Sequence, residues 1–267
     1  MVWELYETAH SDLQEFAEDS AGLKGKIQQY RHFNDVAQKI AILWENKQPS
    51  SDEERDKFYA ETDLYLFELS LLHTQRSSRK TIMTQTVNIL NFLQLSVDTH
   101  ITDFGGGIGT EALSLLNIGY KNIILVDLNK HLLDFAKYRA EKYNLPLMTM
   151  RNFQGCNPDV IITYFCLEHI FNIEEIIKMF FESGMTFLIE KSSFGVHIDK
   201  ENPNLTWPQH SEYTAGQFQD LMNKYDWFKL EKPNPYYPNV WVNSSWYLEN
   251  INKLQYKTIK EYLHRGD

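Results

Sequence analysis

The sequence is poor in cysteine, has fewer basic than acidic residues, and contains no long apolar run. Two cysteines, Cys156 and Cys166, occur in 267 residues, and neither their number nor their spacing indicates a disulfide framework or a metal site. Lysine and arginine number 26 against 36 aspartates and glutamates, for a formal net charge of −10, which argues against a broad nucleic-acid contact surface. No apolar run approaches a membrane span. We therefore expect neither a nucleic-acid nor a membrane partner.

The start of the chain and its one basic cluster fit the same picture. Residues 1–7 lack the basic and apolar regions of a signal peptide, so we expect a reduced, cytoplasmic protein. The basic cluster at residues 76–80 is expected to be a solvated helix end and not an RNA contact. The sequence carries no signal for an oligomeric state.

Glycine is also scarce, with 12 residues, but several of them fall in one stretch. Residues 101–110 are typical of a strand that leads through Gly105, Gly107 and Gly109 into a helix. Alternating glycines let the backbone turn tightly and approach a ligand with no Cβ in the way. The helix that follows presents unpaired N–H groups at its first turn. The stretch therefore predicts a nucleotide-type binding loop.

Two features indicate which nucleotide the loop binds. A dinucleotide loop has Gly or Ala at its sixth position, where this chain has Thr110. Asp103 places a carboxylate at the strand end, which would repel a pyrophosphate and would suit a cationic amino group. Asp103-x-Gly105-x-Gly107-x-Gly109 resembles the glycine-rich first motif of class I S-adenosylmethionine (SAM)-dependent methyltransferases. The resemblance implies that these four residues bind SAM, which carries an ammonium and a sulfonium.

A second acid ends the next predicted strand. Asp127 follows residues 122–126, and at that position a carboxylate can accept both ribose hydroxyls of a nucleoside. Its neighbours Leu128 and Asn129 are expected to flank the adenine edge or the ribose.

The chain departs from the family after the third predicted strand, residues 148–150. Many members have an acid there that holds the adenine amino group, whereas this chain has Asn152 and Phe153. An amide carbonyl can accept the same hydrogen bond, and a phenyl ring can stack on a base. We include both among the cofactor-binding candidates.

The apolar fourth strand, residues 159–164, leads into a second matching segment. Residues 167–169 resemble the Leu-Glu-His segment that follows this strand in many small-molecule methyltransferases. Tyr164 and Phe165 are expected beside the reactive methyl group, where their rings could face the sulfonium. We count His169, His210 and Tyr164 as catalytic candidates. The two histidines are the plausible bases because histidine titrates near neutral pH, and a base is needed only if the acceptor loses a proton.

The pattern of elements predicts an α/β fold in two parts. Residues 1–95 read as helices and are expected to form a lid, from which four side chains could reach a substrate. Residues 96–267 are expected to form a SAM-binding, Rossmann-like catalytic domain. It contains a seven-stranded, mostly parallel sheet with one antiparallel strand, flanked by helices. The four lid candidates are Tyr59, Tyr65, His73 and Arg76.

Two details of the helical part are further expectations. Ser11 has the form of a capping-box residue at the start of a first helix, and Ser51 caps a third. Apolar residues from Phe58 to Leu72 are then expected to lie on that third helix.

The leading functional hypothesis is transfer of a methyl group from SAM to a small-molecule acceptor by in-line displacement. One alternative keeps SAM but changes the reaction to intramolecular cyclisation, which forms azetidine-2-carboxylate and releases methylthioadenosine. Methylation of RNA or protein would need a basic or extended recognition surface. A catalytically silent SAM-binding partner of another enzyme is a further alternative. His197 and Asp199 form a pair without a third ligand, so we expect no metal.

Overall fold

The computed structural model describes residues 3–18, 20–196, 208–230 and 237–250. These contain a seven-stranded sheet with the strand order β3-β2-β1-β4-β5-β7-β6. Strand β7 is antiparallel to both of its neighbours, β5 and β6, and the other neighbouring strands pair in parallel. This confirms the predicted sheet. The strands are β1 (His100–Phe104), β2 (Asn122–Val126), β3 (Met148–Met150), β4 (Val160–Tyr164), β5 (Phe187–Lys191), β6 (Trp227–Leu230) and β7 (Asn239–Asn243).

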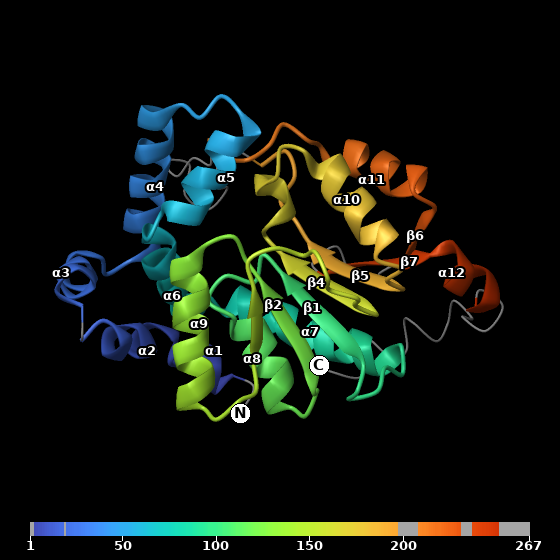
Figure 1. The fold of residues 1–267 in the computed structure, drawn as a ribbon, viewed down its shortest axis with the longest axis horizontal. Coiled ribbons are helices and arrows are strands. Elements are labelled where there is room, and N and C mark those ends of the chain that lie inside the picture. Colours follow the sequence, from blue (N-terminus) through green and yellow to red (C-terminus); the bar gives the residue numbers. More distant parts are fainter. Residues whose placement is uncertain (1–2, 19, 197–207, 231–236, 251–267) are drawn as a thin grey trace.

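Helices cover both faces of the sheet, as Figure 1 shows. Alternate residues of β4 point to opposite faces, which is the period of a strand buried on both sides. Ile162 packs with residues of α7, α8 and α9, whereas Ile161 packs with residues of α10 and α11. The helices of the first face are α7 (Ser77–Phe92), α8 (Thr110–Asn117) and α9 (Lys130–Lys142), and those of the second are α10 (Ile173–Glu182) and α11 (Ala215–Lys224).

The remaining helices precede and follow this sandwich. The N-terminal ones share an apolar core with α9 through Leu132 and Phe135. Asp12 and Arg139, both fully buried, join α2 to α9 by an ion pair with an Nε–Oδ2 distance of 3.1 Å. Every helix in the described ranges is too short or too polar to cross a bilayer. These helices are α1 (Glu4–Glu7), α2 (Ala9–Phe16), α3 (Ala21–Gln29), α4 (Phe33–Lys47), α5 (Asp52–Glu61), α6 (Leu64–Gln75) and α12 (Ser244–Asn250).

Two expectations for the N-terminal helices are wrong. Ser11 lies inside α2, where its hydroxyl donates to the carbonyl of Thr8. The predicted third helix is two helices, because the chain leaves the helical conformation at Thr62. The Asn129 amide donates to the carbonyls of Tyr59 (2.7 Å) and Thr62 (3.0 Å), which satisfies carbonyls at the end of α5 that a continuous helix would have bonded internally. The capping box at Ser51 is present as predicted.

Candidate active site

A cavity of about 1060 Å³ lies at the carboxyl ends of β1, β2 and β4. This is the edge at which open α/β sheets bind ligands. Helices α5, α6 and α7 also contribute lining residues, so the N-terminal part of the chain takes part directly in the cavity. All four lid candidates line it: Tyr59, Tyr65, His73 and Arg76.

The glycine loop lies against the cavity in the left-handed conformation that favours glycine. Gly105 has φ +66° and Gly107 has φ +57°, and both line the cavity. A Cβ on Gly107 would lie 2.6 Å from Cδ1 of Leu69, on α6. Gly109, also left-handed at φ +70°, does not line the cavity; it precedes α8 and packs towards Leu125. Two of the three predicted glycines therefore border the ligand space, and the third shapes the turn.

Asp103 is 1% exposed at the end of β1 and lines the cavity. Its Oδ2 accepts a hydrogen bond from the backbone N–H of Ala112, in the first turn of α8, at 3.2 Å. Burial and the neighbouring Glu111 carboxylate raise the pKa of Asp103. A buried acid under this repulsion favours a cation beside it.

Asp127 connects the glycine loop to the end of β2. Its Oδ2 accepts from the Gly107 N–H at 2.9 Å, and its Oδ1 accepts from the Asn129 N–H at 2.8 Å. Burial raises the pKa of Asp127 to about 6, although these two hydrogen bonds act in the opposite direction. Each carboxylate oxygen can accept more than one hydrogen bond, so Asp127 retains acceptor capacity for a ligand.

The residues expected at the adenine lie together at one part of the lining. Leu128 is 42% exposed, Asn152 is exposed, and Phe153 is buried. Phe153 packs against Phe104 in a T-shaped contact, with ring centroids 6.0 Å apart. Asn129 also lines the cavity, while its amide donates to the end of α5 and its Oδ1 caps α9. Its contact with the nucleoside stays a prediction.

Tyr164 and Phe165 line the cavity at the end of β4. The Tyr164 hydroxyl is hydrogen-bonded to Thr86 on α7, and burial raises its pKa. A catalytic role as a base therefore does not fit this hydroxyl, and the role of the ring stays a prediction. Phe165 has φ +55°, which is unfavourable for a residue with a side chain and is found at functional sites.

One buried arginine was missed by the sequence reasoning. Arg79 belongs to the basic cluster expected to be solvated, yet it is 7% exposed and lines the cavity. Its Nη1 lies 3.6 Å from Oε1 of Glu111, and its guanidinium lies 4.6 Å from the centroid of the Phe165 ring. Both partners are far from Arg79 in the sequence, so the basic cluster at residues 76–80 gave no sign that this arginine is buried.

Acidic side chains in the lining outnumber basic ones by nine to four. Glu68 on α6 is one that the sequence reasoning also missed, and burial raises its pKa to about 7. An acidic excess in a partly enclosed space favours a cationic ligand. The acids are Asp52, Asp56, Glu68, Asp103, Glu111, Asp127, Glu168, Glu175 and Glu182, and the bases are Arg55, Arg76, Arg79 and Arg151.

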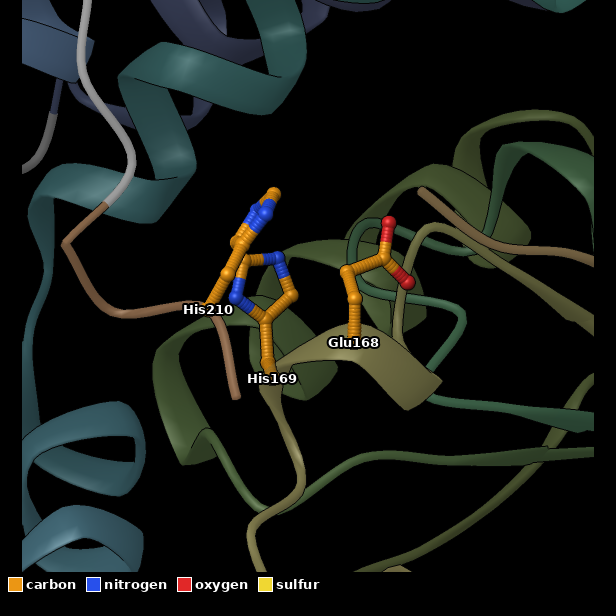
Figure 2. A group of neighbouring side chains, drawn as sticks. All are labelled: Glu168, His169 and His210. Atoms are coloured by element: carbon orange, nitrogen blue, oxygen red, sulfur yellow. The ribbon is translucent and has the colours of Figure 1, made fainter. Parts of the chain in front are cut away.

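The two predicted histidines meet at the other end of the cavity. The rings of His169 and His210 form a T-shaped contact with centroids 4.6 Å apart. Figure 2 shows the His169 and His210 rings next to each other, with Glu168 on the same short turn as His169. Burial and the neighbouring His210 lower the pKa of His169, which keeps its imidazole neutral. Burial raises the pKa of Glu168 to about 7. His197 and Asp199, the pair rejected as metal ligands, lie outside the described residues.

The strand order and the solved structures that match it define the class of fold. It is the fold of class I SAM-dependent methyltransferases. Magnesium protoporphyrin IX methyltransferase from Synechocystis PCC 6803 with bound SAH matches with a TM-score of 0.51 and 14% identity, over 76% of this chain and 100% of that one. A SAM-dependent methyltransferase from Clostridium acetobutylicum ATCC 824 matches with a TM-score of 0.51 and 13% identity, over 65% and 94%. No protein-family model and no curated protein sequence matches the chain.

Proposed function

We propose that the protein is a SAM-dependent methyltransferase that acts on a small-molecule acceptor. The observation that carries this proposal is the buried carboxylate of Asp103 and the half-buried carboxylate of Asp127, beside a left-handed glycine loop in an acidic cavity. A phosphate ligand would meet repulsion there, whereas the ammonium and sulfonium of SAM would be attracted. The bound SAH of the Synechocystis enzyme with the same fold supports the choice of ligand.

The residues at the loop end fit the parts of SAM in turn. We assign the two ribose hydroxyls to Asp127, which has acceptor capacity beyond its two backbone hydrogen bonds. We assign the amino group to the region of Asp103, where a cation would relieve the repulsion between that acid and Glu111. Phe153, Leu128 and Asn152 would then lie at the adenine.

The reaction needs little chemistry from the protein. The acceptor's lone pair forms a bond to the methyl carbon while the carbon–sulfur bond breaks, and the electron pair of that bond stays on sulfur as neutral SAH. The methyl group is already activated by the positive sulfur, so alignment and exclusion of water are the main contributions. Where the acceptor must lose a proton, His169, whose pKa is lowered, and His210 are the candidate bases.

The size and enclosure of the cavity support a small acceptor. Ligand pockets typically measure about 300–1,000 Å³, and this cavity of about 1060 Å³ leaves room for a second molecule beside a nucleoside. We propose that the helices of residues 1–95 act as the lid, since α5 and α6 line the cavity.

Incubation of the purified chain with methyl-labelled SAM tests the proposal. We expect the chain to bind SAM and to form SAH only when a metabolite fraction below about 1 kDa is added. The Asp103→Asn variant serves as the control that lacks SAM binding.

Three results would overturn the proposal. If the chain does not bind SAM, SAM is not its cosubstrate. If label is transferred only to RNA or protein, the acceptor is not a small molecule. If methylthioadenosine forms from SAM alone, the reaction is cyclisation or lysis of SAM and not methyl transfer.

A further inference from the structure

Three groups with metal-ligand chemistry lie together at the histidine end of the cavity. Glu168, His169 and His210 each offer one ligand atom, and these three atoms lie within 4.8 Å of one another. The first two come from the short 3₁₀ turn Leu167–His169 after β4, and His210 comes from the segment before α11. Figure 2 shows the three side chains on one side of the 3₁₀ turn. We call them the Glu-His-His cluster.

The hydrogen bonds around the cluster favour the tautomer of His169 that carries the proton on Nδ1. The Tyr59 hydroxyl donates its single hydrogen to the carbonyl of Gln209 at 3.1 Å. The same oxygen lies 3.1 Å from Nδ1 of His169, so it must accept there, and Nδ1 carries the hydrogen. In the neutral ring the lone pair is then on Nε2.

The other histidine is oriented in the same way. Nδ1 of His210 lies 2.6 Å from the carbonyl oxygen of Val196. A carbonyl only accepts, so Nδ1 donates and the lone pair of the neutral ring is on Nε2. Histidines that bind metals are held in this way, by donation from the second ring nitrogen to a carbonyl or another oxygen.

The Glu168 carboxylate provides a second and independent observation. The residue is 1% exposed, and its Oε1 accepts from the Ser193 N–H at 3.1 Å. Its Oε2 is buried and has no hydrogen-bond partner among the described residues. Buried polar atoms in folded proteins are nearly always satisfied, so this oxygen calls for a ligand, and a cation would satisfy it.

We propose that the Glu-His-His cluster binds a divalent transition-metal ion such as Mn²⁺, Fe²⁺, Co²⁺ or Zn²⁺. Two imidazoles favour these ions over Mg²⁺ and Ca²⁺, which prefer all-oxygen sites. Ligand atoms about 2.1 Å from one ion lie about 3 to 3.5 Å apart. Side-chain movements of about 1 Å would therefore bring the three ligand atoms to the distances that a bound ion requires. Three protein ligands leave further coordination positions, and all three residues line the cavity.

The site also specifies the acceptor class, a step that rests on the proposed methyltransferase function. An acceptor hydroxyl on the metal would lose its proton to solvent, because a bound divalent ion lowers the pKa of a coordinated oxygen. The oxygen then forms the bond to the methyl carbon as the carbon–sulfur bond breaks. His169 and His210 are ligands in this scheme and not bases, and the reaction is an O-methylation.

Metal binding is tested without turnover. The full chain is treated with EDTA, dialysed and titrated with Mn²⁺, and free Mn²⁺ is measured by electron paramagnetic resonance. We expect one bound ion, and at least tenfold weaker binding in His210→Ala and in Glu168→Gln. His131→Ala removes an exposed imidazole on α9 and should bind as the wild type does.

SAM affinity, measured on the same samples, separates this proposal from the proposed function and reports folding of the variants. The metal site is overturned if the wild type binds no ion, or if both variants that retain SAM binding also bind Mn²⁺ like the wild type. If turnover with a hydroxyl acceptor is unchanged by EDTA, the acceptor step is overturned. At least tenfold loss with EDTA, restored by Mn²⁺, supports it.

Discussion

The two ends of the cavity are built in different ways. At the glycine-loop end, Asp103 and Asp127 are held by backbone N–H groups of Ala112, Gly107 and Asn129. At the other end, the Glu-His-His cluster is held by contacts from separate parts of the chain, among them a tyrosine on α5. The first end depends on local backbone geometry and the second on tertiary packing. We therefore expect the two ends to respond separately to substitution.

The largest effect is expected from exchanging one charged group at each end. Asp103→Asn should weaken SAM binding at least 100-fold, or about 2.7 kcal/mol, because it removes a buried negative charge from beside the cationic ligand. The same variant should bind Mn²⁺ within about twofold of the wild type, and His210→Ala should show the reverse. Calorimetric titration of both variants with both ligands measures the two affinities. If either variant lost affinity for both SAM and Mn²⁺, the two ends of the cavity would be one cooperative unit.

A smaller effect is expected from Tyr59→Phe. This change removes the oxygen that accepts from Nδ1 of His169, and loss of such a partner typically weakens metal binding by about tenfold or more. SAM affinity should stay the same. Tyr138→Phe is the matched control, since its hydroxyl bonds to Glu15. Equal Mn²⁺ affinities of the two variants would show that Tyr59 does not orient the ligand.

The smallest effect is a pH dependence of SAM binding through Asp127. Its pKa in the ligand-free protein is raised to about 6, and SAM needs the ionised form. The fraction ionised falls about tenfold between pH 7.5 and pH 5, so this group should lower the affinity by about that factor. In Asp127→Asn, binding should be weaker, and this contribution to the pH slope should disappear. A wild-type affinity that is flat over this range would contradict the assignment.

Stability without ligand should follow the opposite sign. The folded state keeps a proton on Asp127 between about pH 4 and about pH 6, where the unfolded chain has lost it. The free energy of unfolding contributed by this group therefore falls as pH rises through that window. Denaturation curves in the absence of SAM measure this part.

Most of the sheet could be predicted from the sequence. The bounds of β2 and β3 agree with the predicted strands. Strand β2 is a short apolar run followed by Asp127, and the strand before the glycine loop is followed by Gly105. The glycine loop was predictable for a related reason: three glycines in alternation have few uses other than a close turn.

The sequence failed where partners come from far along the chain. Arg79 looked like part of a solvated helix end, but Glu111 and Phe165 surround it in the folded protein. The cluster's histidines were predicted singly, as bases. Glu168 was predicted only as part of the Leu-Glu-His segment, so the meeting of the three side chains was missed. His210 is 41 residues from His169, and no periodicity spans that distance.

Asn129 has a consequence for which residues this position tolerates. Its Oδ1 accepts from the backbone N–H groups of His131 and Leu132, while its amide donates to the carbonyls of Tyr59 and Thr62. One side chain thus begins α9 and ends α5. Aspartate has nearly the same shape and would keep the first role. It would, however, set a negative charge against two carbonyl oxygens. Natural variants should therefore keep asparagine here, even though aspartate is as common at helix starts.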